Sequence, residues 1–128
     1  MKIQTSTYCA IRILQYLHTH QAEVSSAAVI SQSIGIAYPF LIKIANQLKH
    51  SGLIDAVQGR NGGYFLARPA QQISVYDAFL ATAGKLEVSN QRCSRGVLPS
   101  HLLDEFFCEL QEKIIEEMKR TKFSELSR

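Results

Sequence analysis

The centre of the chain carries a glycine-rich turn, Gly59-Arg60-Asn61-Gly62-Gly63, between two short apolar runs. These runs are residues 53–57 and 64–67, and Arg68-Pro69 follows the second. An Asn-Gly pair between such runs is a strong hairpin signal, because both residues accept a positive φ. We therefore predict a two-stranded β-hairpin that ends at Arg68-Pro69.

Two helices joined by a short turn are predicted immediately before this hairpin. The first is short, is capped by Ser25 or Ser26, and ends at Gly35, which tolerates the left-handed conformation. The second begins two residues later with Pro39 in its first turn, where a missing amide donor costs nothing, and Gly52 closes it. This arrangement predicts a helix-turn-helix.

Three further helices are predicted around this unit. Apolar residues recur at helical spacing over residues 5–20, and Ser74 can cap a helix that runs to about residue 83. The longest helical pattern begins at Pro99, after a polar loop, and ends near Lys119. Thr121 is predicted to cap a last turn. The fold class is therefore mainly α with a small β-hairpin wing, a winged helix-turn-helix followed by a long C-terminal helix.

The third helix of the chain has the size to enter the major groove of duplex DNA, and the hairpin tip can reach the backbone or the minor groove. The outward side chains of both elements are rich in hydrogen-bond donors and include no carboxylate: Tyr38, Ile42, Lys43, Asn46, Gln47, Lys49, His50, Gln58, Arg60 and Asn61. A merely solvated helix face is the alternative, but such faces usually mix both charge signs. We therefore predict a double-stranded DNA partner.

The long C-terminal helix has an apolar face too wide for a helix with only one neighbour. This width predicts a homodimer in which the helix pairs with its symmetry mate. The predicted interface residues are Leu103, Phe106, Phe107, Leu110, Ile114 and Met118.

Composition excludes several classes. A chain of 128 residues suits a single structural domain, divided into a DNA-binding part (1–84), a sensor-type loop (85–98) and a dimerisation part (99–128). No apolar run approaches the roughly 20 residues that span a bilayer, and no signal peptide is evident, so we expect a cytoplasmic protein without a membrane partner. The net charge of +3 permits an anionic partner without demanding one. No paired carboxylates, metal-spaced cluster, phosphate loop or nucleophile motif indicates an enzyme.

The segment from Ile36 to Pro69 resembles the DNA-binding half of the bacterial regulator family that contains IscR, NsrR and CymR. The match is carried by the helix Lys43-Ile44-Ala45-Asn46-Gln47-Leu48, by the wing from Val57 to Tyr64, and by the sequence LARP that leads into the next helix. The N-terminal sequence MKIQTSTYCAIRIL also aligns without gaps, and the DNA-binding half is most similar to the NsrR branch.

This resemblance implies a dimer that reads an imperfect palindrome. Lys43 and Gln47 would face the major groove, with Tyr38 and Pro39 near its edge, and the wing would reach an adjacent groove or phosphates. The sequence departs from the family at Ala37, Gln58, Ser6 and Tyr8, where serine, arginine or basic residues are usual. Each departure weakens a phosphate contact.

The cysteines bear on the question of a sensor. Family members with an iron–sulfur cluster carry three cysteines in the loop before the dimer helix, and only Cys93 matches one of them. We therefore predict no cofactor and no metal. Cys93, flanked by Arg92 and Arg95, is a candidate redox sensor, whereas Cys9 and Cys108 are expected to be buried structural thiols.

Three functions remain to be compared. The favoured one is a DNA-binding transcriptional repressor, with a partner protein or a small ligand as a candidate regulator. A continuous basic stripe through Lys43, Arg60 and Arg68 would support it. The alternatives are a winged-helix adaptor that has lost DNA binding and a thiol-based redox sensor that acts through Cys93.

Overall fold

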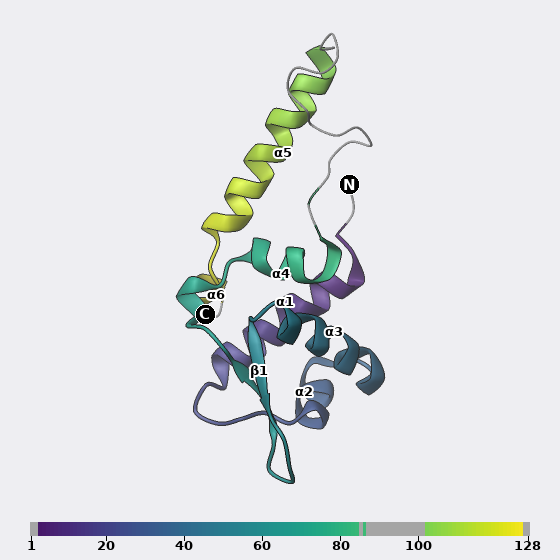
Figure 1. Ribbon diagram of the computed structural model, residues 1–128, viewed down its shortest axis with the longest axis vertical. Helices are drawn as coiled ribbons and strands as arrows, with labels where there is room; N and C mark the ends of the chain where they lie inside the picture. Colours follow the sequence, from purple (N-terminus) through teal and green to yellow (C-terminus); the bar gives the residue numbers. More distant parts are fainter. Residues whose placement is uncertain (1–2, 85, 87–101, 127–128) are drawn as a thin grey trace.

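The computed structural model describes residues 3–84, 86 and 102–126. It confirms the mainly helical class with a hairpin wing. Figure 1 shows the wing at one end of the molecule and the long C-terminal helix projecting from the other. The elements in chain order are α1 (Thr5–Thr19), α2 (Ala27–Ile34), α3 (Tyr38–His50), β1 (Ile54–Val57), β2 (Gly63–Leu66), the 3-10 turn η1 (Ala70–Gln72), α4 (Val75–Ala83), α5 (Leu102–Arg120) and α6 (Phe123–Leu126).

The helix-turn-helix consists of α2 and α3. The Ser26 side chain caps α2 by accepting a 3.2 Å hydrogen bond from the Val29 amide. Gly35 ends α2 in the left-handed conformation, with φ at 69°, as the sequence predicted. The two helices meet at 112°, within the range of about 90–120° typical of this motif. Among the described residues, no single helix is long and apolar enough to cross a membrane, and these two would qualify only as this bent pair.

The hairpin forms where it was predicted, but the stated reason was wrong. Strands β1 and β2 are antiparallel, with Ile54 opposite Leu66 and Val57 opposite Gly63. The positive φ of the turn lies at Gly59, at 114°, and neither Asn61 nor Gly62 has one. A Cβ atom at Gly62 would instead collide with the carbonyl oxygen of Val57. Gly62 is therefore required for close approach of the backbone rather than for a left-handed conformation.

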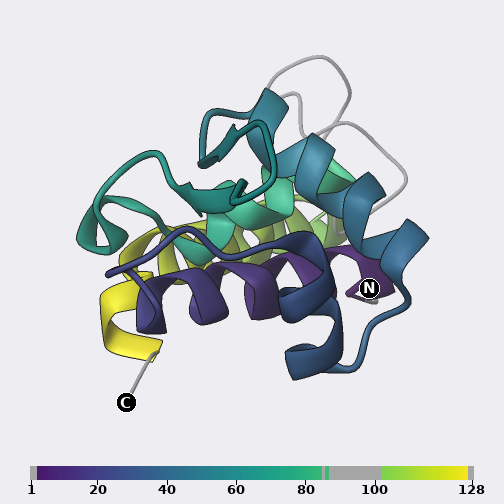
Figure 2. The same cartoon turned by 90° about the horizontal axis from the view of Figure 1, so that it is seen from below.

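The main core lies between α1, α3 and α4, with β1 packed against α3. Figure 2, seen from the wing end, shows α1 and α3 in front, with α4 and α5 behind them. Its largest fully buried side chains come from the first three helices, the start of the hairpin, the residue after η1, and α6: Ile13, Leu14, Leu17, Ile30, Leu41, Ile44, Leu48, Leu53, Ile54, Ile73 and Phe123.

The C-terminal segment returns to this core through Phe123. The Phe123 amide donates to the Ile73 carbonyl at 3.0 Å, and the Val75 amide donates to the Thr121 carbonyl at the same distance. The Thr121 side chain donates back to the Glu117 carbonyl at 3.0 Å. Thr121 therefore terminates α5, and its predicted role as a cap of the following turn was wrong.

A smaller cluster joins α4 to the base of α5. Tyr76, Phe79 and Leu86 are buried there, and Ile114, Ile115 and Met118 of α5 pack against them. Helix α4 begins with a capping box in which the Asp77 amide donates to the Ser74 hydroxyl and the Ser74 amide donates to the Asp77 carboxylate. The base of α5 is thus attached to the domain.

One buried polar pair was not predicted. Thr7 of α1 is fully buried, and its hydroxyl lies 2.8 Å from that of Thr82 of α4. Thr82 donates its own proton to the Ala78 carbonyl at 2.9 Å, so Thr7 is the donor of the pair. This hydrogen bond sets the register between the two helices, which pack along each other.

Replacing Phe123 by alanine should destabilise the whole domain by about 3–5 kcal/mol, because the substitution leaves a cavity under α1 and η1. Urea unfolding followed by circular dichroism measures this loss. Leu126→Ala is the matched control, since Leu126 is 38% exposed, and it should cost less than about 0.5 kcal/mol. Equal losses in the two variants would show that α6 is not anchored through Phe123.

Candidate nucleic-acid interface

The burial pattern of α3 separates its two faces. Leu41, Ile44, Ala45 and Leu48 are completely buried, and they recur at the three- and four-residue spacing of a helix face. The opposite face of the helix presents these exposed residues of the predicted set: Tyr38, Pro39, Lys43, Asn46, Lys49 and His50.

Two members of the predicted set are less accessible. Ile42 and Gln47 are half-buried. The Oε1 atom of Gln47 is buried and has no hydrogen-bond donor among the described residues. Gln47 is therefore at the edge of the exposed face rather than at its centre.

The N-terminus of α3 carries no side-chain cap and no acidic residue in its first turn. Ala37 occupies the N-cap position, so no side chain accepts from the free amides at this end of the helix. Tyr38 is exposed. Burial, and to a smaller extent the charge of Tyr38, raise the pKa of Tyr64 on β2. This end of α3 therefore offers donors and a positive helix dipole beside the wing.

The wing presents Gln58, Arg60 and Asn61 at its tip, all of them exposed. Figures 1 and 2 show the hairpin beside the helix-turn-helix, on the opposite end of the molecule from α5. The structure therefore brings the hairpin tip to the same end of the molecule as the helix-turn-helix.

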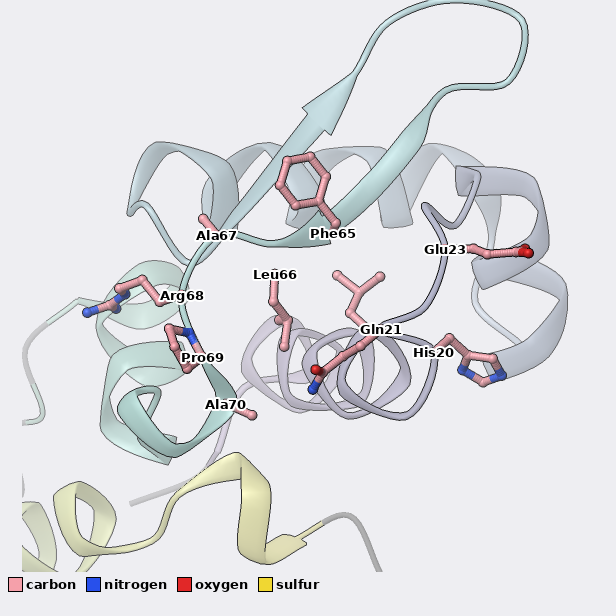
Figure 3. A pocket seen from close by; sticks show the side chains of 10 residues that line it. His20, Gln21, Glu23, Phe65, Leu66, Ala67, Arg68, Pro69 and Ala70 are labelled. Atoms are coloured by element: carbon pink, nitrogen blue, oxygen red, sulfur yellow. The ribbon is translucent and has the colours of Figure 1, made fainter.

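Arg68 does not join this group. Its guanidinium lies 3.9 Å from the Asp77 carboxylate of α4, and its Nε atom is buried without an acceptor among the described residues. Figure 3 shows Arg68 at the rim of a hollow of about 280 Å³ between α1 and β2, with its charged end pointing away from it. The ion pair joins Arg68 to α4 but leaves 41% of its side chain exposed, so its contact with DNA stays a prediction.

The hollow in Figure 3 is lined by polar side chains such as Gln21 as well as apolar ones such as Leu66, and the carboxylate of Glu23 points away from it.

The apolar side chains of α5 become less exposed from its N-terminal end to its C-terminal end. Leu102, Leu103 and Phe106 at its free end are 85%, 62% and 57% exposed. Phe107 and Leu110 are half-buried, whereas Ile114 and Met118 pack against α4 of the same chain. The predicted interface set is therefore divided between an exposed outer part and an inner part that has a partner within the chain.

Comparison with known proteins places this geometry in a family. The model of the Rrf2 family, described as an iron-dependent transcriptional regulator, matches residues 3–128. The protein belongs to the Rrf2 family. This family consists of transcription regulators rather than enzymes, and the resemblance noted from the sequence is confirmed.

Solved structures of similar fold cover almost the whole Rrf2 chain. CymR, the global cysteine regulator of B. subtilis, has a TM-score of 0.83 at 21% identity and covers 99% of this chain and 96% of its own. IscR of T. potens has a TM-score of 0.82 at 21% identity, covering 98% of this chain and 85% of its own. The oxidized form of Staphylococcus aureus CymR has a TM-score of 0.80 at 21% identity, with coverage of 100% and 97%.

A curated relative is protein aau3 of Rhizobium meliloti (strain 1021), which is 35% identical over 82 residues. The aligned stretch makes up 64% of this chain and 53% of the relative. The chain thus matches about half the length of that relative.

The family description raises the question of iron. Among the described residues, no three His, Cys, Asp or Glu side chains converge on one point. Cys9 is 7% exposed within the core, and burial raises the pKa of its thiol. Cys108 is half-buried and disulfide-bonded, so the prediction that it is a buried structural thiol was wrong. These residues do not fit an iron site, and Cys93, the candidate redox sensor, lies outside the described residues, as does the predicted loop except for Leu86.

Proposed function

We propose that this Rrf2 protein binds double-stranded DNA as a homodimer and acts as a cytoplasmic transcriptional repressor. The observation that carries the proposal is that α3 has one buried and one exposed face. Its apolar face is wholly buried, whereas Lys43 and Asn46 on the other face are exposed. A helix held in this way can enter the major groove with its polar face towards the bases.

The wing supplies the second element of the proposed interface. Arg60 and Asn61 are exposed at the same end of the molecule as α3, where a cation and an amide suit phosphates and groove edges. The uncapped N-terminus of α3 adds free amide donors, which favour a phosphate oxygen at that position. Ala37 and Gln58 donate less to phosphate than the serine and arginine usual in the family, so we expect the operator to differ from the common ones.

The outer half of α5 supports the proposal of a homodimer. Leu102, Leu103 and Phe106 are exposed on an arm whose base is anchored to α4. Pairing this arm with its symmetry mate would bury these side chains, at about 25 cal/mol per Å² of apolar area. A two-fold axis through α5 would place two copies of α3 on one face of DNA and explain recognition of a palindrome.

Changing Phe106 or Leu110 to aspartate should give monomers at micromolar concentration and abolish DNA binding, because a carboxylate would be buried at the proposed interface. Sedimentation velocity measures the assembly. Glu116→Ala, an exposed position on the same helix, should remain dimeric. A wild-type protein that sediments as a monomer under these conditions would contradict the proposed dimer.

Lys43→Ala and Arg60→Ala should affect DNA binding in different ways. Lys43→Ala should change which sequences are preferred, at a cost of about 1–3 kcal/mol at one base pair. Arg60→Ala should weaken all sequences about equally and reduce the salt slope by about one, as expected for a phosphate contact. Fluorescence anisotropy on promoter DNA at several salt concentrations measures both. Unchanged binding in both variants would favour the adaptor function.

We also propose that the protein acts without an iron–sulfur cluster. A cluster needs about four converging ligands, and among the described residues none of the required groups converge. Anaerobic reconstitution with iron and sulfide, followed by iron analysis and a visible spectrum, should leave the protein colourless and able to bind DNA. Stoichiometric iron with a charge-transfer band that is lost in Cys93→Ser would contradict this proposal.

A further inference from the structure

The wing is fastened to the helix-turn-helix by two hydrogen bonds outside the hairpin. The Ser25 amide donates to the Tyr64 carbonyl at 3.0 Å, and the Tyr64 amide donates to the Ser25 carbonyl at 2.8 Å. Ser25 is buried and directly precedes Ser26, the N-cap of α2. Strand β2 is therefore joined by backbone bonds to the residue before the helix-turn-helix begins.

Gly63 makes this pairing sterically possible. A Cβ atom at Gly63 would collide with the Ser25 carbonyl oxygen, and would lie 2.5 Å from the Ser25 carbonyl carbon and 2.7 Å from the Ser26 nitrogen. All three atoms belong to the backbone, so no side-chain rotation can relieve the collision. Gly63 has no positive φ. Glycine is therefore needed at this position because a larger residue would not fit, and not because of the backbone conformation.

The wing tip has little other support on this side. Between the tip and the turn that joins α1 to α2 lies a hollow of about 700 Å³, lined by Arg60, Asn61 and Glu23 among others. Ser25 and Gly62 both line this hollow. The base of the hairpin packs against α3 and α1, and the Ser25–Tyr64 pair adds a backbone link closer to the tip.

We propose that Gly63 is a positioning residue for DNA binding, because it lets β2 pair with Ser25 and so holds Arg60 and Asn61 at a set distance from α3. The proposal rests on the proposed DNA binding. Replacing Gly63 by alanine forces β2 away from Ser25, so that Arg60 no longer reaches the phosphate next to the bound helix-turn-helix.

The first test needs no DNA. Amide hydrogen exchange should become faster at Ser25 and Tyr64 in Gly63→Ala, while the amide of Leu48 in the core of α3 keeps its wild-type rate. Gly84→Ala is the control, because Gly84 lies at the end of α4 with φ at 76° and open space around it; it introduces backbone strain far from the wing. Unchanged exchange at Ser25 and Tyr64 would overturn the proposal.

The second test is a double-mutant cycle with Arg60 on promoter DNA. Gly63→Ala should weaken binding about as much as Arg60→Ala, on the order of tenfold, and should remove the same unit of salt slope. In the Arg60→Ala background, the further loss from Gly63→Ala should be less than about twofold. An equal loss in both backgrounds would indicate a general structural effect and overturn the positioning role.

The two tests separate the possible failures. Suppose that exchange at Ser25 and Tyr64 becomes faster in Gly63→Ala but the wild-type protein binds no DNA. The proposed function and the positioning role would then both be refuted, whereas the collision between a Cβ at Gly63 and Ser25 would still explain the exchange result. Should Gly63→Ala fail to fold, Ser25→Pro removes the Ser25 amide donor and fixes the local backbone while it leaves Gly63 in place, and it should give the same loss of salt slope. An unaltered salt slope in folded Ser25→Pro would overturn the proposal.

Discussion

The burial of one side of α3 is the interaction on which the rest of this structure depends. Leu41, Ile44 and Leu48 are completely buried against α1, α2 and α4, and each such side chain contributes on the order of 1.5–3 kcal/mol. Because these residues fill one face, rotation of α3 about its axis would expose them. The same apolar contacts that stabilise the domain therefore determine that Lys43 and Asn46 face outward.

Helix α5 combines two environments in one element. Its base is held by the cluster around Tyr76 and Phe79, and α6 returns Phe123 to the main core beneath α1. The free end carries apolar side chains that the described part of the chain leaves exposed. In the proposed homodimer, an arm anchored at one end and apolar at the other would transmit the orientation of the partner helix to the domain, because both ends belong to one helix.

Much of the organisation was predictable because local signals agree with the tertiary structure. The Ser26 cap, Gly35 in the left-handed region, Pro39 in the first turn of α3 and the Ser74 cap of α4 all appear where the sequence placed them. Such features depend on residues within one helical turn, so the sequence contains all of their causes. The exposed face of α3 could be predicted because it lies opposite the apolar one, although Ile42 and Gln47 are half-buried, and its contact with DNA stays a prediction.

The remaining features depend on neighbours that are distant along the chain. The pattern Asn61-Gly62 determined that a hairpin would form, but the reasons for Gly62 and Gly63 are collisions with Val57 and Ser25 that only the folded backbone creates. The hydroxyl of Thr82 lies 2.8 Å from that of Thr7 only because α1 and α4 pack together. The carboxylate of Asp77 lies 3.9 Å from Arg68, a contact that the sequence did not predict. The sequence by itself determined the elements, their order and their apolar faces, because these follow from local propensity and periodicity. The tertiary structure decided which polar groups are used within the fold, because pairing and steric contact depend on distances that the order of residues does not specify.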